Sequence, residues 1–198
     1  MEIVNFIKQY IKNPKTVGAV APSSEKLADR MVEDINFLNA TCIIEYGPGT
    51  GIFTEKILNK KKDSTIFIAI EYNLDFYKIL KDKFRDETNF ILINDSAENI
   101  KEYLDKYNID KVDYIISGLP FASLPDTMSQ TILSVTKEIL KAKGEFITFQ
   151  YTLFKMNLFR KYFDKIKRKK VLLNLPPAYV LRCKNVKFIN YFNKDNWS

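Results

Sequence analysis

The chain has 198 residues, 46% of them apolar, which suits one folded domain with a substantial core. It has no histidine and only two cysteines, Cys42 and Cys183, which excludes histidine-based catalytic triads, histidine–metal sites and a disulfide framework. The net charge is +7, and the segment from Lys155 to Lys170 alone carries +7, from eight basic residues and one acidic residue. This concentration of positive charge in one segment favours a partner with an anionic surface.

Hydrophobic periodicity predicts the elements in chain order. Residues Ile3 to Lys12 have the spacing of a short amphipathic helix, and a second helix begins at Pro22-Ser23-Ser24 and runs to about Leu38. Buried strands are predicted at Cys42–Tyr46, Ile66–Ile70, Phe90–Ile93, Tyr114–Ile116 and Phe146–Phe149. Helices are predicted between them at Thr54–Lys62, Asn73–Phe84, Ala97–Tyr107 and Pro125–Lys141. This alternation predicts a parallel sheet with helices on both faces.

The C-terminal part has a different pattern. The basic segment Phe154–Lys167 is predicted to be a helix. Two strand-like runs follow, Val171–Leu175 and Tyr179–Cys183, joined by Pro176-Pro177. We therefore expect a partly antiparallel, hairpin-like end to the sheet.

A glycine-rich turn follows the first predicted strand. The residues from Glu45 to Gly51 read E-Y-G-P-G-T-G, and they precede a helix. Glycines at such a turn let the backbone approach a ligand closely. A dinucleotide fingerprint would need its third glycine one place later, where Ile52 stands, so an NAD site fits less well. A tight turn without a ligand is the alternative.

Two acidic residues end the next two strands. Glu71 follows the second strand, 20 residues after Gly51, where a carboxylate can accept hydrogen bonds from both ribose hydroxyls. Asp95 follows the third strand and can accept a hydrogen bond from an exocyclic amine. Each acid alone could be a helix cap or a surface residue. Together with the glycine turn, they indicate a nucleoside pocket along one sheet edge.

This combination resembles the class I S-adenosylmethionine-dependent methyltransferases. The resemblance implies a Rossmann-like fold with a seven-stranded, mostly parallel sheet, helices on both faces and a reversed C-terminal hairpin, here with an additional N-terminal amphipathic helix. The backbone of the three glycines would lie close to the methionine and ribose groups of S-adenosylmethionine. Glu71 would bind the ribose hydroxyls, and Asp95 with the Ser96 backbone would bind the adenine. The residues expected to bind the cofactor are Glu45, Tyr46, Gly47, Gly49, Thr50, Gly51, Glu71, Tyr72, Asp95, Ser96, Ala97 and Ser117.

The fourth strand ends in Ser117-Gly118-Leu119-Pro120-Phe121. Amino-methyltransferases that act on adenine have Asn-x-Pro-aromatic at this place, and the asparagine accepts a hydrogen bond from the planar amine. Gly118 stands at the asparagine position, which removes the acceptor and opens space. An aliphatic amine has a localised lone pair and depends less on a hydrogen-bond acceptor from the protein. Glycine at position 118 therefore favours an aliphatic amine as the substrate. A Gly-Pro turn without a substrate role is the alternative.

The order of motifs over residues 1–183 is similar to that of the bacterial phospholipid N-methyltransferases, which also resemble the rRNA adenine dimethyltransferases. The motifs are V-G-A-V-A-P-S-S at 17–24, the glycine turn, S-G-L-P-F, and N-L-P-P-A at 174–178. The resemblance implies methylation of the phosphatidylethanolamine head group, S-adenosylhomocysteine as product, and no metal. Residues 1–24 would form an N-terminal helix and a substrate or membrane lid, and 25–198 the catalytic domain.

The expected substrate end combines aromatic side chains with a cation. Aromatic faces stabilise a methylated ammonium, and an arginine suits the lipid phosphodiester. Gly118, Leu119, Phe121 and Tyr151 are the expected catalytic residues. Tyr46, Tyr151, Asn174, Tyr179 and Arg182 are the expected substrate-binding residues. For Tyr46 and Tyr179, packing in the core is the alternative.

We expect two basic, partly apolar segments, residues 1–12 and 155–170, to bind an anionic membrane surface. The protein would then act in the cytoplasm, peripherally attached to the inner face of the membrane. Packing of both segments on their own domain is the alternative, and RNA could use the same charges. An rRNA adenine N6-methyltransferase, and a non-catalytic protein that binds S-adenosylmethionine or membranes, are the competing functions.

Overall fold

The computed structural model describes residues 24–172 and 177–185. The strands are β1 (Cys42–Tyr46), β2 (Ile66–Ile70), β3 (Phe90–Ile93), β4 (Val112–Ser117), β5 (Leu140–Gln150), β6 (Lys165–Val171) and β7 (Ala178–Lys184). The helices are α2 (Ser24–Val32), α3 (Ile52–Leu58), α4 (Leu74–Lys83), the 3-10 helix η1 (Ala97–Asn99), α5 (Ile100–Lys106), α6 (Asp126–Ile139) and α7 (Met156–Tyr162). The predicted N-terminal helix and lid lie outside the described residues, apart from Ser24, and so does Asn174.

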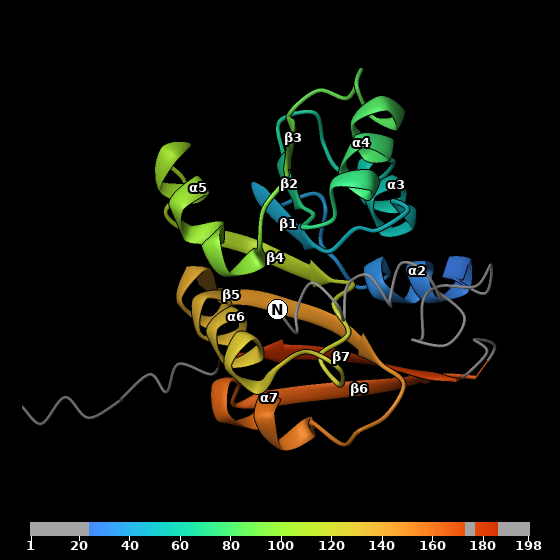
Figure 1. The fold of residues 1–198 in the computed structure, drawn as a ribbon, viewed down its shortest axis with the longest axis vertical. Coiled ribbons are helices and arrows are strands. Elements are labelled where there is room, and N and C mark those ends of the chain that lie inside the picture. The colour runs from blue at the N-terminus through green and yellow to red at the C-terminus, as the bar shows by residue number, and fades with distance from the viewer. Residues whose placement is uncertain (1–23, 173–176, 186–198) are drawn as a thin grey trace, which may run out of the picture.

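All strands belong to one seven-stranded sheet of order β3-β2-β1-β4-β5-β7-β6 (Figure 1). The first five strands are parallel, and β7 lies antiparallel between β5 and β6. The predicted fold class, including the reversed C-terminal hairpin, is confirmed, but the first strand of that hairpin is Lys165–Val171 and not the predicted Val171–Leu175. Because parallel strands finish at the same edge of a sheet, the loops after β1 to β5 meet there. We call this the carboxyl edge.

Helices cover both faces of the sheet (Figure 1). One core cluster joins the sheet to α5, α6 and α7, and includes Leu104, Leu133 and Phe159. The other core cluster joins it to α2 and α3, and includes Leu27 and Ile57. Burial on both faces explains why β1 and β2 are continuous apolar runs instead of alternating ones.

The predicted bounds of β1, β2 and β3 are confirmed, whereas β4 and β5 extend beyond their apolar centres. The helix α2 ends at Val32, six residues before the predicted end near Leu38. Leu38 lies in the turn before β1, and its side chain is 72% exposed. Both cysteines are free and buried, as expected.

The prediction of one helix over Phe154–Lys167 is wrong. The helix α7 ends at Tyr162, and the following basic residues form β6, which pairs with β7 along its whole length. Lysines are tolerated here because β6 is the edge strand, where charged side chains reach solvent and discourage pairing with other chains. Pairing with β7 therefore overrides the weak strand propensity of a lysine-rich sequence.

Residues 24–172 and 177–185 contain no helix with the length and apolar character needed to cross a bilayer. The same residues contain no group of three side chains that could hold a metal ion.

Candidate functional site

A cavity lies at the carboxyl edge, among the loops that follow β1 to β4. Its empty volume is about 780 Å³, open solvent at the mouth included. Its wall, as far as the structure describes it, consists of Gly47, Gly49, Ile70, Glu71, Tyr72, Asn73, Phe76, Asp95, Ser96, Ala97, Gly118, Leu119, Pro120, Leu124, Met128 and Ile132.

The glycine turn holds its backbone open toward this cavity. The Gly47 N–H donates to the Ile70 carbonyl at 2.9 Å, which ties the turn to the end of β2. Gly49 has a φ of 57°, in the left-handed region that favours glycine, and a Cβ built there would meet no atom within 4 Å. The open space beside Gly49 is therefore available to a ligand.

The loop after β4 touches the glycine turn through backbone atoms. The Gly118 N–H donates to the Tyr46 carbonyl at 2.8 Å. A Cβ built on Gly118 would lie only 2.6 Å from the Gly47 carbonyl oxygen. Real Cβ atoms do not approach a backbone oxygen that closely, so this backbone accommodates no side chain at position 118.

Glu71 connects the ends of β1 and β2 from the cavity wall. Its carboxylate accepts hydrogen bonds from the Gly49 N–H at 3.0 Å and from the Asn73 N–H at 2.8 Å. Burial raises the pKa of Glu71 above its ordinary value, although these two hydrogen bonds favour the charged form. The carboxylate thus fixes the glycine turn and still lines the cavity.

Asp95 lies at the end of β3 and is held by three donors. Its carboxylate accepts from the Ser96 N–H at 2.7 Å, from the Tyr103 hydroxyl at 2.9 Å and from the Asn99 amide at 3.1 Å. Partial burial opposes ionisation, but the three hydrogen bonds outweigh it and hold the pKa of Asp95 below its ordinary value. A charged acceptor is therefore fixed in the wall.

Glu45 lies beneath the glycine turn instead of in the wall, and it is fully buried. Its Oε2 accepts from the Thr54 hydroxyl at 2.7 Å, while Oε1 has no hydrogen-bond partner in the described part of the chain. Burial raises the pKa of Glu45 to about 8, against the hydrogen bond from Thr54, and the nearby charge of Glu71 raises it further.

We expect Glu45 to make the protein less stable at alkaline pH. The folded state raises the pKa of the Glu45 carboxyl above the ordinary 4.5, so the protonated carboxyl makes its full contribution to folding stability below pH 4.5. This contribution is lost as the pH rises through the folded-state pKa of about 8. Glu45→Gln, which cannot ionise, should therefore exceed the wild type in unfolding free energy at pH 9, by up to a few kcal/mol. Urea unfolding at pH 5 and pH 9 measures the difference. The same substitution at the exposed Glu25 is the control, and equal pH profiles for Glu45→Gln and wild type would contradict the expectation.

The structure brings seven of the residues expected to bind the cofactor together in the cavity wall, namely Gly47, Gly49, Glu71, Tyr72, Asp95, Ser96 and Ala97. The others lie outside the wall. Thr50 is exposed in the turn, Gly51 packs against side chains of α4, and the Ser117 hydroxyl accepts from the Leu119 N–H at 3.2 Å. These residues shape the loops instead of facing the cavity. Of the expected catalytic residues, Gly118 and Leu119 line it.

The four aromatic residues expected around the amine are not gathered together. Tyr46 and Phe121 are 0% exposed, so the expectation that their side chains contact substrate is wrong. The Tyr46 hydroxyl accepts from Thr136 of α6 at 3.3 Å, and the Phe121 ring packs edge-on against Phe146 and Phe159.

The other two aromatic residues, Tyr151 and Tyr179, are half-buried against opposite faces of the sheet. The Tyr151 ring packs edge-on against Phe149 with centroids 5.5 Å apart, and the Lys170 Nζ lies 5.9 Å from the centroid of Tyr179. Neither belongs to the described cavity wall. None of the four aromatic residues expected around the amine therefore lines the described part of this cavity.

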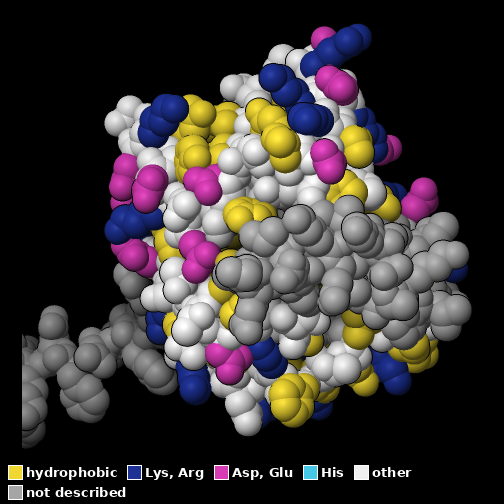
Figure 2. All heavy atoms as spheres, in the orientation of Figure 1, with side chains coloured by type: hydrophobic (Ala, Val, Ile, Leu, Met, Phe, Trp, Pro, Cys, Tyr) yellow, Lys and Arg dark blue, Asp and Glu magenta, His cyan; other side chains and the backbone are white. Residues whose placement is uncertain are grey.

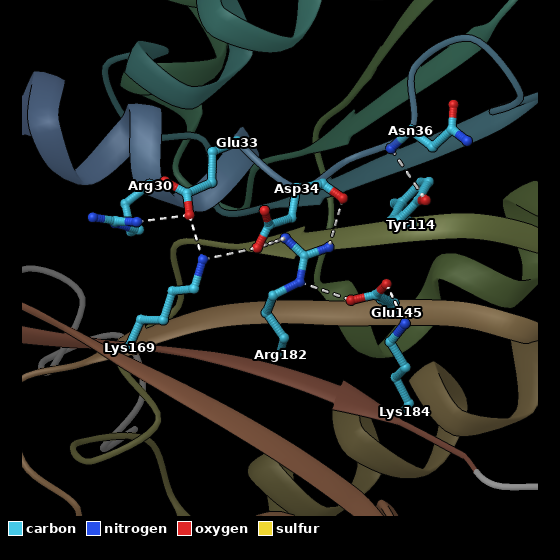
Figure 3. A network of polar contacts seen from close by, with 9 residues as sticks. All are labelled: Arg30, Glu33, Asp34, Asn36, Tyr114, Glu145, Lys169, Arg182 and Lys184. Carbon is cyan, nitrogen blue, oxygen red and sulfur yellow. Dashed lines mark hydrogen bonds and ion pairs between the residues drawn. The ribbon is translucent and has the colours of Figure 1, made fainter.

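Arg182 is also engaged elsewhere, which corrects its expected role at a phosphodiester. Its Nε donates to Glu145 at 2.8 Å, and its Nη2 donates to the Asp34 carbonyl at 3.2 Å (Figure 3). Its side chain is only 7% exposed. The network in Figure 3 continues through Lys169 to Glu33 and Asp34, so these residues tie the C-terminal hairpin to the region after α2.

Sequence reasoning missed much of the apolar wall. Met128 and Ile132 line the cavity from one side of α6, and Phe76 lines it from the first turn of α4. The spacing of Met128 and Ile132 does reveal an apolar helix face. That spacing is the same for a face that packs in the core and for one that contacts a ligand, so it could not single these residues out.

The chain matches the family model described as ribosomal RNA adenine dimethylase over residues 22–176. It is 29% identical to an ornithine lipid N-methyltransferase of Singulisphaera acidiphila, over 92% of this chain and 95% of that protein. It is 31% identical to ribosomal RNA small subunit methyltransferase A of a Sulfurihydrogenibium species, over 56% of this chain and 42% of that protein. The match therefore spans less than half the length of the ribosomal RNA enzyme.

Solved structures have the same fold at low sequence identity. Precorrin-6y C5,15-methyltransferase from Geobacter metallireducens has a TM-score of 0.62 and 14% identity, over 81% of this chain and 88% of that one. The O-methyltransferase TomG from Streptomyces achromogenes, solved with S-adenosylmethionine, has a TM-score of 0.62 and 12% identity, over 84% and 82%. The fold, the cavity and the match over residues 22–176 show that the chain belongs to the ribosomal RNA adenine dimethylase family of S-adenosylmethionine-dependent methyltransferases.

Proposed function

We propose that this methyltransferase transfers its methyl group to the head-group amine of a membrane lipid, with phosphatidylethanolamine and its methylated intermediates as acceptors. The observation that carries the proposal is the lack of space at Gly118, where a Cβ would lie 2.6 Å from the Gly47 carbonyl oxygen. It leaves no room for the asparagine with which adenine methyltransferases hold a planar amine. The relative named for ornithine lipid matches over nearly the whole of both chains, which supports a lipid acceptor.

In this proposal, S-adenosylmethionine lies along the carboxyl edge. The open backbone at Gly49 faces the methionine and ribose, and Glu71 accepts hydrogen bonds from the ribose hydroxyls. Asp95 and the Ser96 N–H lie nearest the adenine, with Ala97 and Phe76 against its faces. The fit is supported by the position of all these residues in one wall and by the charge on Asp95.

The reaction needs little chemistry from side chains. The lone pair of a neutral amine attacks the sulfonium methyl, so the S–CH₃ bond breaks as the N–CH₃ bond forms, and S-adenosylhomocysteine leaves. The ammonium that forms can lose its proton to water before another round. Catalysis then comes mainly from holding the two reactants in line. The Gly118 carbonyl and the apolar wall from Leu119 and Met128 would orient the amine at the inner end of the cavity.

The substrate requires contact with a membrane, and we place the protein on the cytoplasmic side, bound peripherally to an anionic surface. The basic segment 155–170 supports this placement, because Arg160, Lys161, Lys165, Lys167, Arg168 and Lys170 make no ion pair with another described residue. Cations near anionic lipid add about 1 kcal/mol each to binding. Residues 1–12 are proposed to contribute in the same way.

Methylation of adenine in ribosomal RNA is the second candidate. The family model and the relatives named ribosomal RNA small subunit methyltransferase A favour it. The same basic segment would suit a phosphate backbone. Against it stands the steric exclusion of a side chain at Gly118.

Labelled S-adenosylmethionine separates the two candidates. The purified full chain is incubated with phosphatidylethanolamine vesicles, with ornithine lipid vesicles and with unmethylated ribosomal RNA, and label is counted in each acceptor. We expect label in phosphatidylethanolamine. Label in ornithine lipid alone would support a lipid amine as the acceptor but with a different head group from the one proposed. Label in RNA alone would overturn the proposal.

A further inference from the structure

Large apolar side chains remain exposed along the carboxyl edge, the edge at which the cavity lies. Tyr72 and Leu74 follow β2 and are 48% and 51% exposed. Phe154 follows β5 and Leu172 directly follows β6, and these are 86% and 68% exposed. Single exposed apolar residues are ordinary, but several along one edge of a sheet favour an interaction surface.

The sheet topology places these residues on both sides of the cavity. Both β5 and β6 run antiparallel to β7, so they point in the same direction and finish at the same edge. The register puts Gln150, Tyr179 and Lys170 in one row across the sheet, and the chain continues past this row to Phe154 and to Leu172. Because β1 and β4 lie between β2 and β5, the mouth is flanked by apolar residues on either side.

The apolar face of α7 is not available to a membrane. Phe159 is 0% exposed and Phe163 is 2% exposed, since both pack on the sheet. Among the described residues from 151 to 172, only Phe154, which precedes the helix, and Leu172, which follows β6, are large apolar residues with exposed side chains. In this region, insertion would therefore occur through Phe154 and Leu172 and not through α7 lying flat.

Basic side chains accompany these loops. Arg168 and Lys170 of β6 are exposed and lie close to Leu172 in sequence, and neither has an ion pair with a described residue. Figure 2 shows basic and hydrophobic side chains next to each other along the lower border, over α7 and β6. Apolar residues that enter the acyl region with cations at head-group level are the pattern of an interfacial membrane contact.

We propose that the carboxyl edge is the membrane-docking surface, with Phe154 and Leu172 inserted into an anionic bilayer and Arg168 and Lys170 at its phosphates. In this orientation the cavity mouth faces the lipid, so an amine head group can enter while its acyl chains stay in the membrane. This use of the surface rests on the proposed lipid substrate, whereas the docking itself is tested independently.

Flotation with vesicles of phosphatidylcholine, with and without phosphatidylglycerol, tests the docking surface on the full chain. The double variant Phe154→Ser/Leu172→Ser should bind the anionic vesicles at least about tenfold more weakly than wild type. Leu38→Ser is the matched control, because Leu38 is 72% exposed but lies before β1 at the opposite edge. Binding of the double variant equal to wild type, or an equal loss with Leu38→Ser, would overturn the docking surface.

Tryptophan fluorescence measures directly whether position 154 enters the bilayer. The one native tryptophan, Trp197, is replaced by phenylalanine, and a new tryptophan is placed at position 154 or, as control, at position 38. Vesicles should shift the emission to the blue, and brominated lipid should quench it, only for Phe154→Trp. Unshifted emission from position 154 on bound protein would contradict insertion.

The two proposals can fail separately. If Phe154→Ser/Leu172→Ser loses methyl transfer to lipid in vesicles but keeps it in detergent micelles, with unchanged S-adenosylmethionine affinity, both proposals are supported. If the wild type methylates no lipid but the double variant still loses vesicle binding, the docking surface stands and the lipid acceptor is wrong.

Discussion

Replacing Glu71 by alanine should reduce the affinity for S-adenosylmethionine by at least about tenfold, because it removes a buried hydrogen-bond acceptor for the ligand. It also releases the Gly49 and Asn73 N–H groups, which Glu71 fixes at 3.0 and 2.8 Å. The glycine turn then loses its connection to the end of β2 at the point where it faces the cavity. Isothermal titration of the full chain with S-adenosylmethionine measures the loss.

Asp75→Ala is the control for this experiment. Asp75 is an exposed acid in the first turn of α4, close to Glu71 in sequence but absent from the described wall. It should bind the cofactor as the wild type does. If Glu71→Ala retained wild-type affinity while folded, Glu71 would have no place in the binding site.

The sequence predicted the acidic residues of the cavity because their position depends on topology alone. Glu71 directly follows β2 and Asp95 lies two residues after β3, and the ends of neighbouring parallel strands must meet at one edge. The apolar runs of β1 and β2 fix those ends, since nearly every residue in them is buried. Strand ends in a parallel sheet are therefore a reliable guide to a site.

The aromatic residues could not be placed in the same way. Tyr46 ends β1 beside the glycine turn, yet its ring enters the core and its hydroxyl bonds to Thr136, 90 positions away. Which face a side chain takes is decided by the helix that packs there, and no local pattern encodes this. The basic residues of β6 were misjudged for a related reason, since only their pairing with β7 makes them a strand.

The amine-binding end of the cavity depends on the absence of a side chain at position 118. We expect Gly118→Ala to reduce methyl transfer by about a hundredfold, because its Cβ would force apart two loops that must hold the reactants in line. A Cβ there would lie 2.6 Å from the Gly47 carbonyl oxygen, and hydrogen bonds from Gly118 to Tyr46 and from Gly47 to Ile70 hold both backbones in place. The initial rate at saturating S-adenosylmethionine, measured per folded molecule, tests this.

Gly144→Ala is the matched control, since its Cβ would also be crowded, at 3.0 Å from the Leu140 side chain and the Lys141 carbonyl, but in β5 away from the cavity. It should lose stability, by about 1–3 kcal/mol as overpacked sites do, and keep its activity when folded. Gly118→Asn tests the steric argument itself. It carries the same Cβ, so we expect it to be as inactive as Gly118→Ala on lipid and on RNA alike. If it instead folded normally and methylated adenine, the loop would accommodate an asparagine, and the steric argument for an aliphatic amine would fail.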